Sequence, residues 1–318
     1  MIDPADQMMC IAQDFSAPIT FFVEATEFIS MEVLEASVDS VRQQLVQAVA
    51  QGHDVQLHIH PQWEHATKLP DGIWRVANDR WRIGDLSFAN TLRLLRMGKE
   101  WLEDVVNAED YRVLAFRAGG WCIQPSTSVI RALSGLGFLV DSTVAPSFWN
   151  IAHGEWSDFR SVPKMPYWKS DSNVCSTVSS GLWEVPIVTG RIAPCRHLRT
   201  VKSSRLHGDG ALACGCRGSY RGPDGGWGRL KGKLGKVMRL GHVMLDFSTM
   251  PVDVLTDITQ QWMNRYGDDT KALPLVAIAH TKNFTSASEK HLAGYLAWAK
   301  DQGLQFSTYG KWLEALGE

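Results

Sequence analysis

The stretch Gly52-His53-Asp54-Val55-Gln56-Leu57-His58-Ile59-His60 decides the fold prediction. Its apolar run ends at Pro61, which cannot donate a ladder hydrogen bond, so residues 54–60 are predicted to form a buried strand. Upstream, residues 19–23 (Ile-Thr-Phe-Phe-Val) are β-branched and aromatic, which is typical of a strand buried on both faces. Apolar residues at helical spacing predict a helix over residues 33–50. This part of the chain is therefore one strand–helix–strand unit.

The same alternation continues along the chain. Further strands are predicted at residues 112–116, 138–140, 182–187, 275–279 and 305–307, and further helices at residues 86–106, 126–136 (with Ser126 as N-cap), 252–266 and 288–301. Alternating strands and helices favour parallel strands, in a barrel or a doubly wound sheet. No phosphate-loop or Gly-x-Gly-x-x-Gly motif opens a helix, which argues against a dinucleotide-binding fold. We expect one α/β domain over residues 1–318.

Composition excludes several classes of function. A net charge of −2 and a pI near 6.6 favour neither a nucleic-acid binder nor a membrane-surface protein. No run approaches the roughly 18 apolar residues that a membrane helix needs. The start lacks the basic and apolar regions of a secretory leader, so we expect a cytoplasmic protein with reduced thiols. Cys214 and Cys216 lack a second pair at zinc-finger spacing and are interpreted as an incidental loop pair.

Residues 194–240 interrupt the alternation. This segment is rich in glycine, arginine and lysine and contains only two acidic residues, Asp209 and Asp224. A solvated basic insertion within the domain is the favoured interpretation. The alternative is a loop that attracts an anionic glycan or a nucleotide-linked sugar.

Two histidines on one predicted strand are the main candidates for chemistry. His58 and His60 are two residues apart, so both side chains leave the same face of the strand near its carboxyl end. An unpaired imidazole in a buried strand is costly, whereas a histidine pair binds a divalent metal well. We therefore predict that His58 and His60 bind a divalent cation.

Two further strand ends carry polar or aromatic candidates. Arg117 follows a predicted strand and precedes Gly119-Gly120-Trp121, so its guanidinium could orient a carboxylate beside an aromatic wall. His280 ends the strand at residues 275–279 and could act in acid–base catalysis. The chain has 13 tryptophans, of which Trp63 and Trp121 are the candidates for stacking against a sugar.

Several of these segments, in this order, resemble the polysaccharide deacetylase (NodB-homology, carbohydrate esterase) family. Ile19-Thr20-Phe21-Phe22-Val23 resembles the family's Ala-Thr-Phe-Phe-Val strand, and Gly52-His53-Asp54 with His58 resembles its Gly-His-Glu motif before a metal histidine. Residues 117–121 match Arg-x-x-x-aromatic, residues 137–142 resemble a Gly-Tyr…Asp segment, and residues 278–280 fit a strand that ends in histidine. No single motif is specific, but the ordered set spans residues 3 to 284.

The resemblance implies a distorted (β/α) barrel of about seven parallel strands and a zinc-type cation held by one aspartate and two histidines. It implies hydrolysis of an N- or O-acyl group from a carbohydrate, with a lipid- or nucleotide-linked sugar left open. His58 matches the first metal histidine, and Asp3 the metal aspartate. The second histidine position reads Gln62, so His60 is the geometric substitute and His65 a weaker one. By the same resemblance, Arg117 would orient the catalytic carboxylate and His280 would protonate the leaving group.

The first motif departs from the family pattern. The family places a catalytic-base aspartate one or two residues before the metal aspartate, and those positions are Met1 and Ile2 here. Either the natural start lies further upstream or the base is lost. The alternative functions are a catalytically inactive carbohydrate-binding barrel and, ranked last, a binuclear amidohydrolase, which also has a His-x-His strand.

Overall fold

The computed structural model describes residues 2–77, 79–150, 156–193, 196, 241–267, 270 and 272–318, and it divides the chain into two compact units. The first, which we call the sheet unit, is Thr20–Pro186. The second, the terminal unit, contains residues 2–19 and the described residues after Pro186. The prediction of a single domain over the whole chain stays a prediction.

The sheet unit is built on a six-stranded sheet in the order β1-β2-β5-β6-β10-β9. Its strands are β1 (Thr20–Glu24), β2 (Asp54–Ile59), β5 (Ala115–Ala118), β6 (Val140–Asp141), β10 (Leu182–Glu184) and β9 (Trp168–Ser170). Neighbours from β1 to β10 are parallel, and only the pairing of β10 with β9 is antiparallel. The mixed α/β fold with parallel strands is thus confirmed, whereas a closed barrel is not part of what the structure shows.

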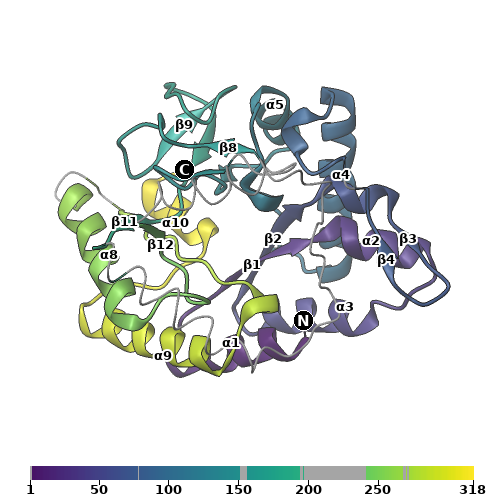
Figure 1. Cartoon of the computed structure of the whole chain (residues 1–318). Helices are drawn as coiled ribbons and strands as arrows, with labels where there is room; N and C mark the ends of the chain where they lie inside the picture. Colours follow the sequence, from purple (N-terminus) through teal and green to yellow (C-terminus); the bar gives the residue numbers. More distant parts are fainter. Residues whose placement is uncertain are drawn as a thin grey trace, which may run out of the picture. The chain divides into compact units, whose positions relative to one another are not determined.

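Helices follow the strands of this unit. They are α2 (Ala25–Val33), α3 (Asp39–Ala50), α4 (Phe88–Val106) and α5 (Thr127–Gly135), with short 3₁₀ turns η1 (Pro61–His65), η2 (Ile83–Asp85) and η3 (Gly119–Trp121). Two-stranded ribbons pair β3 (Thr67–Lys68) with β4 (Trp74–Arg75), and β7 (Trp149–Asn150) with β8 (Ser157–Asp158). Figure 1 shows α2, α3 and α4 beside β1 and β2.

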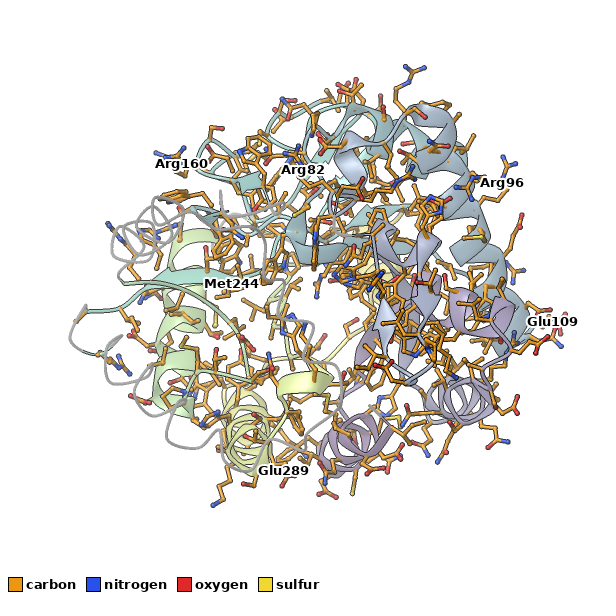
Figure 2. The ribbon with its side chains drawn as sticks, turned by 45° about the vertical axis from the view of Figure 1, so that its right-hand side comes forward. Arg82, Arg96, Glu109, Arg160, Met244 and Glu289 are labelled. Atoms are coloured by element: carbon orange, nitrogen blue, oxygen red, sulfur yellow. The ribbon has the colours of Figure 1, made fainter. Side chains whose placement is uncertain are left out.

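Helix α4 covers one face of the sheet. The missing side chain of Gly98 allows this approach, because a Cβ there would lie 2.8 Å from Leu57 Cδ1 and 3.0 Å from Ile59 Cδ1. Arg96, on the opposite side of α4, is exposed and points outward (Figure 2). Side chains alternate along a strand, so His58, unlike Leu57 and Ile59, leaves β2 on the face turned away from α4.

Gln56 joins β2 to the start of β5. It is 1% exposed, its Oε1 accepts from the backbone N–H groups of Leu114 (2.8 Å) and Ala115 (2.7 Å), and its Nε2 donates to Asp54 Oδ1 (2.8 Å). These bonds satisfy two backbone N–H groups at the start of β5.

We expect Gln56→Leu to lower the free energy of unfolding by about 2–5 kcal/mol, because two buried N–H groups would lose their acceptor. Urea denaturation followed by circular dichroism measures this change. Gln43→Leu, at an exposed position of α3, is the control and should change stability by less than about 0.5 kcal/mol. Equal effects of the two substitutions would contradict the role given to Gln56.

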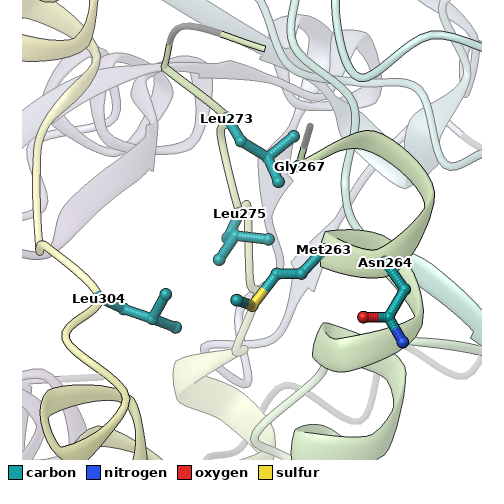
Figure 3. Close-up of a pocket in the computed structure, with 6 residues that line it drawn as sticks. All are labelled: Met263, Asn264, Gly267, Leu273, Leu275 and Leu304. Carbon is teal, nitrogen blue, oxygen red and sulfur yellow. The ribbon is translucent and has the colours of Figure 1, made fainter. Parts of the chain in front are cut away.

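The terminal unit has its own hydrophobic core. Its elements are α1 (Ile2–Asp14), β11 (Thr189–Arg191), β12 (His242–Met244), α8 (Val252–Tyr266), η5 (Thr281–Asn283), α9 (Ser286–Asp301) and α10 (Tyr309–Leu316). Strands β11 and β12 are antiparallel, and Val188, Leu245, Ile258 and Trp262 lie in the buried cluster. A pocket of about 560 Å³ opens at the end of α8 and is lined by Met263, Asn264, Gly267, Leu273, Leu275 and Leu304 (Figure 3).

Most predicted elements are confirmed, with three corrections. The helix predicted over residues 33–50 begins only at Asp39. Helix α2, which ends at Val33, was not predicted. Val33 was expected on the apolar face of the predicted helix, but it is 75% exposed. The strand predicted at residues 275–279 appears as two parallel bridges, Ile187↔Val276 and Asp246↔Ile278. The strand at residues 305–307 was wrong, since those residues pair with no strand in the described part of the chain.

Two other predictions have partial outcomes. The basic segment 194–240, with Cys214 and Cys216, lies outside the described residues except for Arg196, which forms ion pairs with Asp253 and Asp257 of α8. Ser126 is the residue before α5 as predicted, but its hydroxyl donates to Ser172 O (3.2 Å) instead of capping the helix. Within the described residues, none of the helices has the length and apolar character needed to cross a lipid bilayer.

Candidate metal centre

Three neighbouring strands place polar side chains in one row. Glu24, the last residue of β1, is the register partner of His58 in β2, and His58 is the partner of Arg117 in β5. Register partners in a sheet share a face, so these side chains leave the sheet together, on the side turned away from α4. All three lie at or near the carboxyl ends of parallel strands, the edge at which α/β folds collect their functional groups.

The ring of His58 is oriented by a backbone carbonyl. His58 Nδ1 lies 2.7 Å from Arg117 O, and because a carbonyl only accepts, Nδ1 carries the proton. In the neutral ring Nε2 is then the nitrogen with the lone pair that a cation needs. Metal-binding histidines commonly have this second interaction, which holds both the tautomer and the ring orientation.

His60 is oriented by the carboxylate of Glu24. His60 Nδ1 lies 2.5 Å from Glu24 Oε2. The other oxygen of this carboxylate accepts from the backbone N–H of Thr26 (3.1 Å) and from the Thr26 hydroxyl, so Glu24 also caps the N-terminus of α2. The positive end of a helix attracts a carboxylate, so these contacts hold the Glu24 side chain in place.

Glu24, His58 and His60 together form a candidate metal centre. One potential ligand atom from each lies within 4.8 Å of the other two, and the rings of His58 and His60 are 4.7 Å apart and almost perpendicular. Two imidazole nitrogens and one carboxylate oxygen are a donor set that suits zinc and similar divalent cations. The residues present therefore fit the cation that the sequence predicted.

Gly119 leaves the space that His60 occupies. A Cβ at residue 119 would lie 2.5 Å from His60 Cδ2, 2.6 Å from His60 Cγ and 2.6 Å from Ile59 O. No side chain fits there without moving the imidazole or the end of β2. Gly119 is thus a site residue, although it has no functional group of its own.

The Arg117 side chain contacts the neighbouring strand. Its Nε donates to Ser142 O (2.8 Å), its Nη2 donates to Ser142 Oγ (3.1 Å), and its guanidinium carbon lies 4.3 Å from the centre of the Phe22 ring. The backbone of Arg117 orients His58. Its predicted role of orienting a catalytic carboxylate stays a prediction.

Two predicted site residues belong to the terminal unit. Asp3 is exposed in the first turn of helix α1, where the resemblance implied the end of a strand. His280 is half-buried before η5, and its backbone N–H donates to Ser248 Oγ (2.9 Å). Metal binding by Asp3 and leaving-group protonation by His280 both stay predictions.

The remaining candidates lie just after β2 and β5. Trp63, in η1, is half-buried against Trp74, and Trp121, in η3, is half-buried against Phe148. His65 is exposed, and its Nε2 lies 3.7 Å from Glu64 Oε2. It does not belong to the cluster of Glu24, His58 and His60. The sequence prediction missed Glu24, although a carboxylate directly after the strand at residues 19–23 was the signal that could have found it.

Among known proteins, this chain matches only solved structures, and the similarity is low. No family model and no curated protein matches the chain. A Mycobacterium smegmatis protein assigned as a polysaccharide deacetylase matches with a TM-score of 0.33 and 17% identity, over 58% of this chain and 45% of its own. Peptidoglycan deacetylase PdaC from Bacillus subtilis matches at 0.43 and 10% identity, over 100% of this chain and 86% of its own.

A third solved structure is a mutant of a CE4-family pseudoenzyme with restored enzymatic activity. It matches with a TM-score of 0.43 and 12% identity, over 98% of this chain and 63% of its own. The chain thus spans less than two thirds of the length of two of these three proteins. Likeness at this level transfers no function to this chain.

Proposed function

We propose that this protein is a metal-dependent hydrolase that removes an N- or O-acyl group from a carbohydrate. The observation that carries the proposal is the cluster of Glu24, His58 and His60, in which each imidazole already has a hydrogen-bond partner at Nδ1. Such an arrangement reduces the cost of ordering the ligands when a cation binds. The order of the family-like motifs along the chain supports the carbohydrate substrate and a zinc-type cation.

His58 and His60, together with Glu24 or Asp3, would hold the cation, which when bound lowers the pKa of a water molecule and polarises the acyl carbonyl. The carbonyl of Arg117 keeps the proton of His58 on Nδ1, and Glu24 does the same for His60. The Arg117 side chain donates two hydrogen bonds to Ser142. A shift of β5 relative to residue 142 would break these two bonds. We propose that His280 supplies the proton to the leaving group and that Trp63 and Trp121 contact the sugar.

Binding of a glycan without hydrolysis is the competing function. Glu24 is the single carboxylate of the cluster within the described residues, so it has to serve either as a ligand or as the proton acceptor. A hydrolase of this kind needs both roles. We propose Asp3 as the additional ligand that would leave Glu24 available as the acceptor. A closed (β/α) barrel, a cytoplasmic location and a lipid- or nucleotide-linked substrate are further expectations for this protein.

Acetate release from a panel of N-acetylated saccharides tests the proposal. We expect the metal-depleted protein to be inactive and activity to return when Zn²⁺ or Co²⁺ is added in stoichiometric amounts. Saccharide binding is measured in parallel by calorimetry. Binding without acetate release, at any cation concentration, would contradict the hydrolase and support the competing function.

A further inference from the structure

Two acidic side chains lie side by side in the interior of the sheet unit. Asp141 in β6 and Glu184 in β10 are register partners in parallel strands, and both are 0% exposed. Asp141 is also the partner of Phe116, which is the partner of Leu57. The pair therefore lies on the face covered by α4, opposite to the row that contains Glu24 and His58.

The hydrogen bonds around the pair distinguish the two carboxyl groups. Asp141 Oδ1 accepts from the Thr143 hydroxyl (2.7 Å) and Asp141 Oδ2 from the Thr143 N–H (3.4 Å), as expected of a carboxylate. Glu184 Oε1 accepts from the Val144 N–H (3.3 Å). Glu184 Oε2 is fully buried, and among the described residues no donor reaches it. A carboxylate oxygen in that position would be costly, whereas a protonated one can donate to Asp141.

A single shared proton satisfies the whole arrangement. Two ionised carboxylates in contact would repel each other strongly in an interior from which water is excluded. With the proton on Glu184, its carboxyl group can donate to Asp141, its register partner, which keeps its negative charge and its two bonds from Thr143. The pair then carries one net charge instead of two.

The same segment connects the pair to the metal centre. The Thr143 hydroxyl, which donates to Asp141, accepts from the Ala118 N–H (2.9 Å) at the end of β5. The preceding residue, Ser142, accepts two bonds from the Arg117 side chain and donates to Val185 O (2.8 Å). Residues 141–144 thus tie the end of β5 to the end of β10. The carbonyl that orients His58 belongs to this tied end.

We propose that Asp141 and Glu184 share one proton and act as a positioning pair, which holds the carboxyl end of β5 and thereby the orientation of His58. The positioning role rests on the proposed metal centre, whereas the shared proton does not.

The charges around the pair agree with one retained proton. Burial raises the pKa of both carboxyl groups, and the Asp141 charge raises the pKa of Glu184 further, well above its usual range. Arg117 of β5 partly offsets the rise for Asp141, whereas Cys175, which follows β9, raises the pKa of Glu184. The face of α5 toward the interior adds only apolar side chains, Val129, Ile130, Ala132 and Leu133.

Stability as a function of pH tests the shared proton in the metal-free protein. The unfolded chain loses this proton near the ordinary pKa of glutamic acid, whereas the folded chain keeps it, so stability falls as pH rises above that value. Glu184→Gln donates a similar hydrogen bond to Asp141 but cannot titrate. We expect the ratio of the unfolding constants, wild type over Glu184→Gln, to rise by about tenfold per pH unit until the pair ionises.

A ratio that stays within about twofold from pH 5.5 to 8 would overturn the shared proton, since one retained proton requires the larger slope. If Glu184→Gln does not fold, Glu184→Leu replaces it, because that substitution also removes the group that carries the proton. Infrared spectroscopy gives a second readout. The C=O band of a protonated carboxyl should be present in the wild type at neutral pH and absent in Glu184→Gln.

Metal affinity tests the positioning role. At neutral pH we expect Glu184→Ala to weaken Co²⁺ binding by about tenfold, whereas Glu184→Gln should restore it to within about twofold of the wild type. Thr143→Val should also weaken binding but leave the pH dependence of the stability ratio unchanged. Equal Co²⁺ affinity of the wild type and Glu184→Ala would overturn the positioning role. If the wild type binds no cation at all, the proposed function fails, while the stability experiment still decides the shared proton.

Discussion

His58→Ala is expected to weaken binding of a divalent cation by more than about 100-fold and to remove metal-dependent acetate release. Replacing a residue that only orients a ligand costs about 10–100-fold in affinity, and His58 is proposed as a ligand itself. A potential ligand atom of His58 lies within 4.8 Å of those of Glu24 and His60, and its ring proton is held on Nδ1 by Arg117 O at 2.7 Å.

The fold should survive this substitution, because His58 is only half-buried and loses one hydrogen bond, which contributes about 1 kcal/mol. Calorimetric titration with Zn²⁺ and thermal unfolding of the same samples separate the two effects. His65→Ala is the matched control, since His65 is exposed and lies outside the cluster. Unchanged cation binding in His58→Ala, or an equal loss in His65→Ala, would refute the proposed centre.

Gly119→Ala is expected to weaken cation binding by at least about tenfold, although the substitution adds only one methyl group. The added Cβ would lie 2.5 Å from His60 Cδ2 and 2.6 Å from Ile59 O, so either the imidazole or the end of β2 has to move. A moved imidazole loses its hydrogen bond to Glu24. Overpacking of this kind also destabilises a protein by about 1–3 kcal/mol.

Gly135→Ala provides the comparison for this prediction. Gly135 lies at the end of α5, and nothing lies within 4 Å of a Cβ built there. Alanine at such a helical position should be neutral or should stabilise the protein by about 0.5–1 kcal/mol, with cation affinity unchanged. Co²⁺ absorption spectra, measured alongside affinity, report a change in ligand geometry. Identical spectra and affinities for the two variants would show that Gly119 has no role in placing His60.

Local pattern was sufficient to predict most of the sheet unit. Residues 19–23 and 54–60 consist mainly of residue types that favour buried strands, and they form β1 and β2 within one residue of the predicted bounds. The long apolar stripe of α4 was equally clear. One error falls where the pattern misleads, since the spacing of Val33 and Leu34 fits the helical stripe of residues 33–50, but both are exposed residues at the end of α2.

The candidate site was predicted in part. The spacing of His58 and His60 places both on one face of β2, and this requires nothing beyond the period of a strand. Glu24 precedes His58 by 34 residues and becomes its neighbour only through the register of β1 with β2. Asp141 and Glu184 are likewise brought together by the pairing of β6 with β10. Register depends on how two strands pack under their helices, which no local pattern contains.

The sequence by itself determined the type of fold and the histidine pair, because apolar periodicity and side-chain alternation are properties of short segments. Only the tertiary structure decided which carboxylate joins the pair, why residue 119 must be glycine and which buried acids contact each other. These features depend on distances between segments that are far apart along the chain. Hydrogen bonds and steric exclusion at 2.5–3.5 Å act only after the strands have paired.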